Sequence, residues 1–143
     1  MSDPQAIAEA AARSMYEQDR ASQALGMRIL EIRPGYARLA MQVREDMVNG
    51  HKICHGGLIF TLADSAFAFA CNTYDLVTVA SSGSIEFLLP ARLGDELTAI
   101  AEERSRSKRT GVYDVAVHNH NGECVALFRG GSHQIGGRIG AGS

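Results

Sequence analysis

The chain has 143 residues, the size of one domain, and a chain of this length can bury roughly 70% of its unfolded surface. Its formal net charge of −2 gives no general attraction for nucleic acid, and no apolar stretch reaches the ~20 residues of a membrane-spanning helix. Its three cysteines form no even disulfide framework, and the N-terminus does not resemble a secretion signal. We therefore expect a cytoplasmic protein that binds neither nucleic acid nor membranes and carries no cofactor.

The first predicted element is an amphipathic helix over residues 3–20. Asp3 suits the N-cap and Pro4 the first helical position, and apolar residues recur after them at spacings of three and four. Residues 27–33 and 36–43 follow, with the strand-like alternation of apolar and polar side chains clearest in the second. Because Pro and Gly at positions 34 and 35 favour a turn, the two segments are predicted to form a hairpin.

The centre of the chain combines a glycine-containing loop with a long apolar segment. Residues 47–57 contain Asn49-Gly50 and Gly56-Gly57, and residues 58–71 are apolar on nearly every face. A helix of that composition must be enclosed by the rest of the protein.

Four further segments, residues 77–89, 96–103, 112–118 and 124–135, are predicted to be consecutive antiparallel strands, because turn-forming residues separate them. The Gly-rich end of the chain, from Gly136 onward, is expected to be mobile, with the single domain ending at about residue 137.

The order of these elements predicts an α+β fold with one antiparallel sheet around a central helix. It lacks the alternation of strands and helices that is typical of a parallel sheet. A single curled sheet leaves its edges uncovered, and edge-to-edge pairing with a second copy would protect them. We therefore expect at least a homodimer.

Asp64 is the one ionisable side chain within the predicted central helix. Moving an unpaired carboxylate out of water is unfavourable, so a sequence retains one only with hydrogen-bond partners or with a function. Asp64 is then either a structural acid, bonded to Thr61, Ser65 or the backbone of another chain, or a nucleophile or general base in a dry cleft. The spacing of residues does not separate these two interpretations.

His55-Gly56-Gly57 lies immediately before this helix. Glycines allow a close approach of backbone to a ligand, and free N–H groups at a helix N-terminus stabilise developing negative charge. The segment therefore predicts an oxyanion site. Asp64 follows Gly56 by eight residues, which is ~12 Å along a helix axis, so one chain cannot apply both to one small reacting centre. In a dimer, Gly56 of one subunit can face Asp64 of the other.

These features together resemble the hotdog-fold acyl-CoA thioesterases, and within them the phenylacetate-degradation branch. The resemblance is carried by Asn49-x5-His55-Gly56-Gly57-x6-Asp64, by Phe87-Leu-Leu-Pro90 and by Gly94-Asp95. It extends over about residues 15–137 and is strongest over residues 48–72, 110–114 and 126–130. It implies a hotdog fold.

The resemblance also implies roles for the loop and the helix. The Gly56 N–H, with Gly57 beside it at the substrate, would polarise a thioester carbonyl. Asp64 of the partner subunit would attack that carbonyl or activate a water molecule. Asn49 and His55 would orient these groups.

A hydroxyl on the strand after the helix would hold the water, and Ser82 is favoured over its neighbours Ser81 and Ser84. No Glu lies between Gly57 and Asn72, which distinguishes the chain from the branch of the superfamily that uses a Glu further along this helix.

The substrate implied by the resemblance is an acyl-CoA, specifically phenylacetyl-CoA or a hydroxylated derivative. Arg106, Lys108 and Arg109 belong to a local basic run and are candidate contacts for the CoA phosphates, with a solvated turn as an equal alternative. Apolar space beside the helix would hold the acyl group. The expected assembly is a homodimer with shared active sites, arranged as a dimer of dimers.

Two other functional classes stay open at this point. A hotdog dehydratase or hydratase would use a His facing an acid, and an acyl-thioester binding module would keep Asp64 for structure alone. A Cys54 nucleophile is disfavoured, because the adjacent His55 points to the opposite side of an extended loop. His51, Cys54 and His55 lack the further ligands that complete a zinc site, so no metal is expected.

Overall fold

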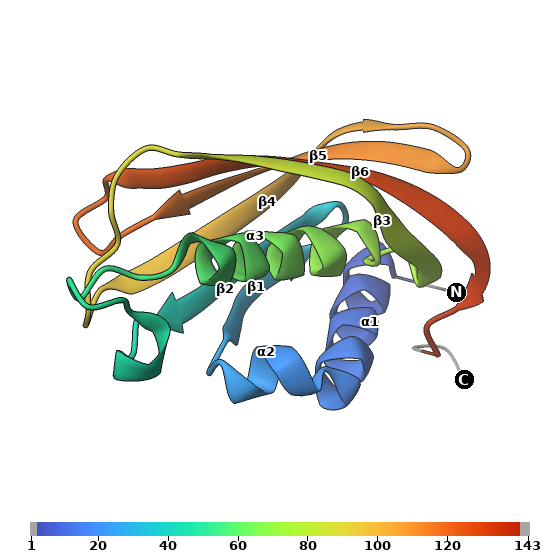
Figure 1. The fold of residues 1–143 in the computed structure, drawn as a ribbon. Coiled ribbons are helices and arrows are strands. Elements are labelled where there is room, and N and C mark those ends of the chain that lie inside the picture. Colours follow the sequence, from blue (N-terminus) through green and yellow to red (C-terminus); the bar gives the residue numbers. More distant parts are fainter. Residues whose placement is uncertain (1–2, 141–143) are drawn as a thin grey trace.

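The computed structural model describes residues 3–140 and contains one sheet curled over one long helix (Figure 1). This architecture confirms the predicted α+β class and hotdog fold. No helix among the described residues is both long and apolar enough to cross a membrane. The elements in chain order are α1 (Pro4–Gln18), α2 (Arg20–Ala24), β1 (Arg28–Arg33), β2 (Tyr36–Gln42), the 3-10 turn η1 (Glu45–Met47), α3 (Gly56–Cys71), β3 (Leu76–Phe87), β4 (Glu96–Arg106), β5 (Thr110–His118) and β6 (Cys124–Arg138).

The N-terminal helix begins as its sequence predicts. The Asp3 carboxylate accepts a hydrogen bond from the Gln5 N–H at 3.1 Å, and Pro4 occupies the first helical position. The short helix α2 was not predicted. Asp19 ends the first helix and caps the second by accepting from the Ser22 N–H at 3.0 Å, so a single residue separates the two helices.

The six strands form one antiparallel sheet in the order β1-β2-β4-β5-β6-β3. The β1–β2 hairpin and the neighbouring strands β4, β5 and β6 confirm the sequence prediction. The prediction that β3 and β4 would be neighbours is wrong, because β3 pairs with β6 at the far edge. The reason is the path of α3, which crosses the concave face and delivers the next strand to the edge opposite β1 (Figure 1).

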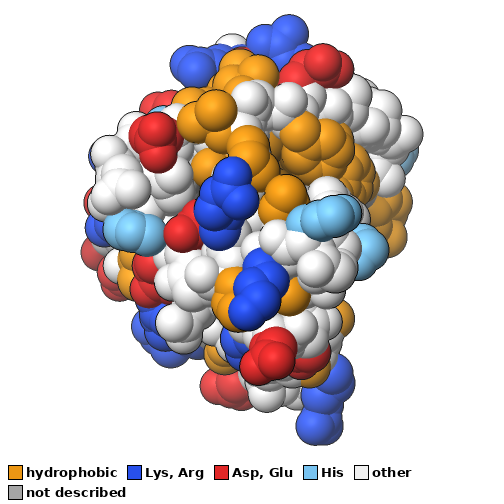
Figure 2. Space-filling view, turned by 60° about the vertical axis from the view of Figure 1, so that its left-hand side comes forward, with side chains coloured by type: hydrophobic (Ala, Val, Ile, Leu, Met, Phe, Trp, Pro, Cys, Tyr) orange, Lys and Arg blue, Asp and Glu red, His pale blue; other side chains and the backbone are white. Residues whose placement is uncertain are grey.

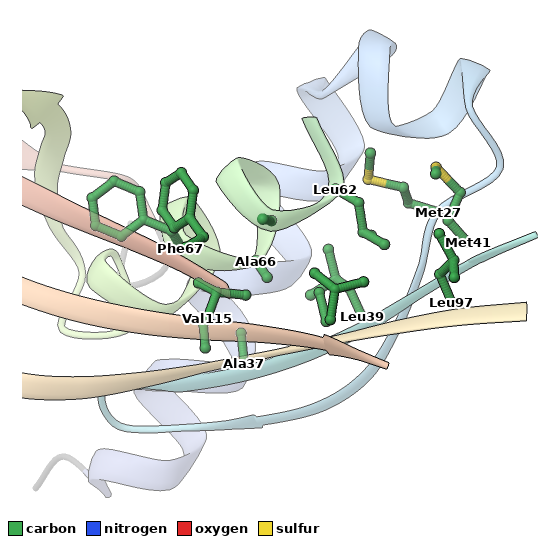
Figure 3. Packing of buried hydrophobic residues seen from close by; sticks show 14 of the residues in the cluster. Met27, Ala37, Leu39, Met41, Leu62, Ala66, Phe67, Leu97 and Val115 are labelled. Atoms are coloured by element: carbon green, nitrogen blue, oxygen red, sulfur yellow. The ribbon is translucent and has the colours of Figure 1, made fainter. Parts of the chain in front are cut away.

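The predicted enclosure of α3 is confirmed for most of its surface. Leu62, Ala66 and Phe67 point into the sheet, where they meet residues such as Leu39 and Val115 (Figure 3). One side of the helix is less covered. The residues of that side are either partly buried or, for Gly57, exposed: Gly57, Phe60, Thr61, Asp64 and Ala68.

Strand β3 is an exposed edge beside that less covered side of α3. Its central residues, 79–84, are all exposed, including Val79 at 43%. A long exposed edge strand has a row of backbone groups available for pairing with another strand.

The C-terminal prediction is wrong in part. Strand β6 continues to Arg138, so Gly136 and Gly137 belong to the sheet instead of a mobile tail. Both have positive φ angles, 93° and 86°, and this backbone conformation accounts for glycine at these positions. The remainder of the predicted tail, residues 141–143, lies outside the described residues.

Asn72 joins the C-terminal end of α3 to the beginning of β3. Its side-chain amide donates to the carbonyl oxygens of Ala68 and Thr78 at 2.8 and 3.0 Å, and its side-chain oxygen accepts from the Thr78 N–H at 2.9 Å. The residue is 5% exposed, so water cannot readily replace these bonds.

We predict that Asn72→Ala lowers the free energy of unfolding by about 1–3 kcal/mol, because it leaves partly buried backbone groups of Thr78 without these partners. Chemical denaturation at fixed protein concentration measures the change. Asn121→Ala, at an exposed turn position, is the control and should change stability by less than about 0.5 kcal/mol. Equal stability of the two variants would contradict this role for Asn72.

Candidate active site

The N-terminus of α3 presents two free backbone donors. His55 is the N-cap residue, with φ −59° and ψ 134°, and its carbonyl accepts from the N–H groups of Leu58 and Ile59 at 3.0 and 3.4 Å. Within residues 3–140, the N–H groups of Gly56 and Gly57 have no acceptor. A helix N-terminus with two unused donors is suited to hold an oxyanion.

The loop before α3 is held in shape by Asn49. Its side-chain oxygen accepts from the N–H groups of His51 and Ile53 at 2.9 and 3.1 Å, and its own N–H donates to the Ile53 carbonyl at 2.9 Å. The His55 N–H donates to the Met47 carbonyl at 2.9 Å. These bonds set the direction in which the chain enters the helix, and they leave the His55 side chain exposed.

Phe87, at the end of β3, lies over Gly56. A β-carbon on Gly56 would be 2.9 Å from Cζ of Phe87, so glycine is required for this close packing. The two residues line a groove of about 350 Å³ with Ile53, Cys54, Ile59, Leu88 and Leu89, which we call the Phe87 groove. Figure 2 shows hydrophobic side chains gathered on this end of the molecule. The contact of Phe87 with Gly56 had no signal in the sequence, where the two are 31 positions apart.

Asp64 lies two turns further along α3, partly buried, and its carboxylate has no hydrogen bond or ion pair within residues 3–140. Burial raises the pKa of this carboxyl above its ordinary value. The two side chains that could have made it a structural acid are engaged elsewhere: Thr61 donates to the Gly57 carbonyl at 2.8 Å, and the hydroxyl of Ser65 lies 3.3 Å from that of Ser22. The chain therefore provides Asp64 with none of the predicted structural partners.

Gly56 and Asp64 are not brought together within one chain. Helix α3 is continuous from Gly56 to Cys71, which keeps them ~12 Å apart along its axis. A site that uses both requires a second copy.

Ser82 is also not brought to Asp64 within the chain. Its hydroxyl lies 2.6 Å from where a β-carbon of Gly131 would be, whereas the neighbouring Gly130 faces the ring of Phe67 in the core. Successive residues of a strand face opposite sides, so the Ser82 hydroxyl lies on the outer face of the sheet. The strand register shifts here, and the adjacent Ser81 hydroxyl donates to the Gly131 carbonyl at 3.2 Å.

The basic residues gather at the turn between β4 and β5, at the end of the molecule opposite the α3 N-terminus (Figure 1). Arg106, Lys108 and Arg109 are exposed and form no salt bridge with any described residue. Arg104 differs from them, because it pairs with Asp114 at 3.0 Å, a carboxylate that it shares with Arg129. Three unpaired cations on one turn fit an anionic ligand.

The rival chemistries have weaker support from the geometry. Burial raises the pKa of the Cys54 thiol to about 11, so this thiol is protonated at neutral pH and is a poor nucleophile. His51, Cys54 and His55 do not assemble a metal site. Among residues 3–140, no group of three or more His, Cys, Asp or Glu side chains could hold a metal ion.

Known proteins resemble this chain in both sequence and structure. Residues 51–126 match the family model of the Thioesterase superfamily. The chain is 51% identical over 128 residues to the acyl-coenzyme A thioesterase PaaI of Escherichia coli (strain K12), covering 90% of this chain and 91% of that protein. The structure of E. coli PaaI, from the phenylacetic acid degradation operon, matches with a TM-score of 0.93 and 48% identity, covering 95% of this chain and 99% of that one. A hypothetical thioesterase from Streptococcus pneumoniae TIGR4, solved with coenzyme A, matches with a TM-score of 0.79 and 26% identity, covering 88% and 97% of the two chains.

The raised pKa of Asp64 leads to a prediction about stability. A raised pKa means that the folded protein holds this proton more tightly than the unfolded chain does, so ionisation of Asp64 destabilises the fold as pH rises above the ordinary value of 3.8. We predict that Asp64→Asn is more stable than the wild type at pH 7 and that the difference disappears below pH 3.8. Thermal unfolding across this pH range, at one protein concentration, measures it.

The control for this experiment is Asp46→Asn, which removes an exposed carboxylate and should give no such gain. If Asp64→Asn instead loses stability at pH 7, then Asp64 is a structural hydrogen-bonding group and not an acid without partners.

Proposed function

Since the chain belongs to the thioesterase superfamily, in which it is an acyl-CoA thioesterase of the hotdog fold, we propose that it hydrolyses aryl-acetyl-CoA esters, either phenylacetyl-CoA or hydroxylated derivatives, to the free acid and CoA. The observation that carries the site assignment is Asp64, a partly buried carboxylate with no hydrogen-bond or ion-pair partner among residues 3–140, on a helix whose first N–H groups find no acceptor there. The 51% identity to an acyl-CoA thioesterase favours thioester hydrolysis over the two alternatives, a dehydratase and an acyl-thioester binding module.

The active site in this proposal is shared between two subunits. Pairing the exposed edge of β3 with the same edge of a second copy, in antiparallel orientation, would place the two α3 helices side by side and in opposite directions. Each helix N-terminus would then approach the middle of the partner helix. Gly56 of one subunit and Asp64 of the other would meet at one thioester, which the geometry of a single chain does not allow.

In this shared site, the Gly56 N–H donates to the thioester carbonyl oxygen and stabilises the negative charge that develops there. Asp64 either bonds to the carbonyl carbon itself or takes a proton from a water molecule whose oxygen forms that bond. The carbon–sulfur bond then breaks and CoA leaves as a thiolate, which is a good leaving group and needs no strong acid. On the direct route, water then hydrolyses the acyl-enzyme anhydride and releases the free acid.

Asn49 holds the loop that presents Gly56, and His55 flanks Gly56 at the end of that loop. Asn49 does so through its hydrogen bonds within the loop, and the exposed His55 side chain is free to contact the substrate. Ser82 stays a prediction as the hydroxyl that holds the water. Because its hydroxyl faces the outer side of the sheet, Ser82→Ala should be compared with Ser81→Ala to learn which serine matters.

The two parts of the substrate fit two different surfaces. The Phe87 groove begins at Gly56 and is lined by apolar side chains, so we place the aryl-acetyl group there, with Gly57 at its entrance. We place the CoA phosphates at Arg106, Lys108 and Arg109. In the antiparallel dimer, the basic turn of one subunit and the α3 N-terminus of its partner lie toward the same end.

Assembly and location complete the proposal. We propose a dimer of dimers, supported by an apolar cross-strand row of Ile100, Ala116 and Leu127 on the outer face of the sheet, where Leu127 is 48% exposed. We propose the cytoplasm as the location, because all three cysteines are free.

We predict that Asp64→Asn lowers kcat for phenylacetyl-CoA by roughly 100-fold or more, because the amide can neither attack the carbonyl nor accept a proton from water. A thiol-release assay measures turnover, and size-exclusion chromatography confirms that the variant keeps its assembly. Asp46→Asn is again the matched control and should keep full activity. Unchanged turnover in Asp64→Asn would remove Asp64 from the mechanism.

Sharing of the site can be tested with mixed subunits. Gly56→Pro removes the donor N–H at a helix position where proline is favoured, and the extended His55 before it suits proline. The new ring atoms press against Phe87, which is 52% exposed and able to move. Each variant alone should be inactive. Refolding Gly56→Pro together with Asp64→Asn in equal amounts should restore about a quarter of the wild-type sites, because half of the dimers regain one of two sites.

The absence of any recovery, in a mixture shown by mass spectrometry to contain heterodimers, would contradict a site shared between subunits. Recovery requires that Gly56 and Asp64 act from different chains.

A further inference from the structure

The hollow at the C-terminal end of α3 has features that the proposed chemistry does not explain. The side chains around it come from the turn between β4 and β5, from the end of α3 and from the segment after it, and they include Tyr74, Arg106, Lys108 and Arg109. The hydroxyl groups of Ser107 and Thr110 lie 2.8 Å apart at its rim. Cations and hydroxyl donors around one hollow favour a phosphate as the ligand.

Arg106 is the most ordered of the three cations by its contacts. Its guanidinium carbon lies 3.5 Å from the centre of the Tyr74 ring, a stacked cation–π arrangement. A guanidinium stacked in this way keeps its N–H groups free at the edge of its plane, where they can donate to two oxygens of one phosphate. Stacking also removes much of the rotational freedom that a long exposed side chain would otherwise lose on binding.

Tyr74 is in turn fixed to the core. Its hydroxyl donates to the Glu103 carboxylate at 2.7 Å, and the same carboxylate oxygen accepts from the Tyr113 hydroxyl at 3.1 Å. Tyr113 is 1% exposed and packs on Phe67 of α3, with 5.6 Å between ring centres. The chain at Gly35 lies so close that a β-carbon there would be 2.9 Å from the Glu103 carboxylate.

The protonation states favour this arrangement at neutral pH. Burial, followed by the hydrogen bond to Glu103, raises the pKa of Tyr74 to about 12, so the phenol remains a donor. Burial likewise raises the pKa of Tyr113. Both phenols therefore stay protonated, and the hydrogen bonds that link the core to Tyr74 persist throughout the physiological pH range.

We infer that Tyr74 is a positioning residue for CoA: anchored through Glu103 and Tyr113, it holds the Arg106 guanidinium over the basic turn so that it meets a phosphate of the nucleotide. This inference rests on the proposed function, since it takes CoA as the ligand. Tyr74 itself touches neither the thioester nor the phosphate. Its effect is confined to the affinity for the phosphate-bearing part of the substrate.

The test measures binding without chemistry. Calorimetry gives the Kd of the wild-type protein and of Tyr74→Leu for CoA, for 3′-dephospho-CoA and for pantetheine, which has no phosphate. Loss of the ring should raise the Kd for CoA roughly 3- to 10-fold and leave the Kd for pantetheine unchanged. If dephospho-CoA shows the same rise as CoA, the diphosphate is the group that Arg106 meets; if it shows none, the group is the 3′-phosphate.

Turnover and further variants separate positioning from a general structural effect. Tyr74→Leu should raise KM for phenylacetyl-CoA by the same factor and leave kcat unchanged. Tyr74→Phe keeps the ring and loses only the hydroxyl, so it should recover most of the affinity. Arg106→Ala should weaken CoA binding, and adding Tyr74→Leu to it should weaken binding no further, because the two residues act through one contact.

The inference is overturned if pantetheine binding weakens as much as CoA binding, if neither changes, or if the effects of Tyr74→Leu and Arg106→Ala add. If Tyr74→Leu does not fold, Arg106→Ala is introduced into both the wild type and Tyr74→Phe, and the Kd for CoA is measured in each. The inference then requires that loss of Arg106 weakens CoA binding more in the wild type than in Tyr74→Phe. Failure of the proposed function would be seen separately, as binding of CoA without hydrolysis of its aryl-acetyl esters.

Discussion

The burial of α3 against the concave face of the sheet is the constraint on which the rest of the structure depends. Full burial of one large apolar side chain stabilises a fold by about 1.5–3 kcal/mol, and α3 contributes Leu62, Phe67 and Phe69 to the core. The sheet must curl to cover such a helix. The sheet covers one face of the helix, and α1 and α2 contact it through Tyr16 and Ser22. The side beside β3 is only partly covered, and Asp64 lies on that side. The gain from apolar packing is what allows the helix to carry a desolvated carboxylate that opposes folding when ionised.

The two ends of α3 differ in a way that suits a site between subunits. At the C-terminal end, Asn72 satisfies backbone groups of both the helix and the next strand, so this end is closed. At the N-terminal end, the loop held by Asn49 leaves two N–H groups without an acceptor in the described part of the chain and exposes apolar side chains around Gly56. In the proposed function, the free donors at one end of α3 and the carboxylate in its middle cannot act on one thioester within a single chain. Its antiparallel partner would supply the missing half.

The hydrogen-bonded cluster of Tyr74, Glu103 and Tyr113 connects the packed core to the Arg106 side chain at the surface. Glu103 lies on β4, whose end carries Arg106, and the two tyrosines come from the segment after α3 and from β5. Three elements that are separate in the sequence thus converge on one cation. In the proposed function, the phosphate contacts and the reacting groups lie at opposite ends of one chain, and the proposed antiparallel dimer would bring those ends together.

The local order of elements and the residue types of the site could be predicted from the sequence, because they depend on periodicity, capping and short motifs. Asp3 and Pro4 start α1, alternation and a Pro-Gly turn produce the β1–β2 hairpin, and the apolar run predicts a buried α3. The spacing from Gly56 to Asp64 already excluded a single-chain site that uses both residues on one small group, since the rise of a helix is fixed. Tertiary structure alone decided that β2 lies beside β4 and that β3 lies beside β6, because alternation shows which side chains share a face and says nothing of the strand beside them. For the same reason, the placement of β3 at the edge, of Phe87 on Gly56 and of Tyr74 under Arg106 had to come from the folded chain.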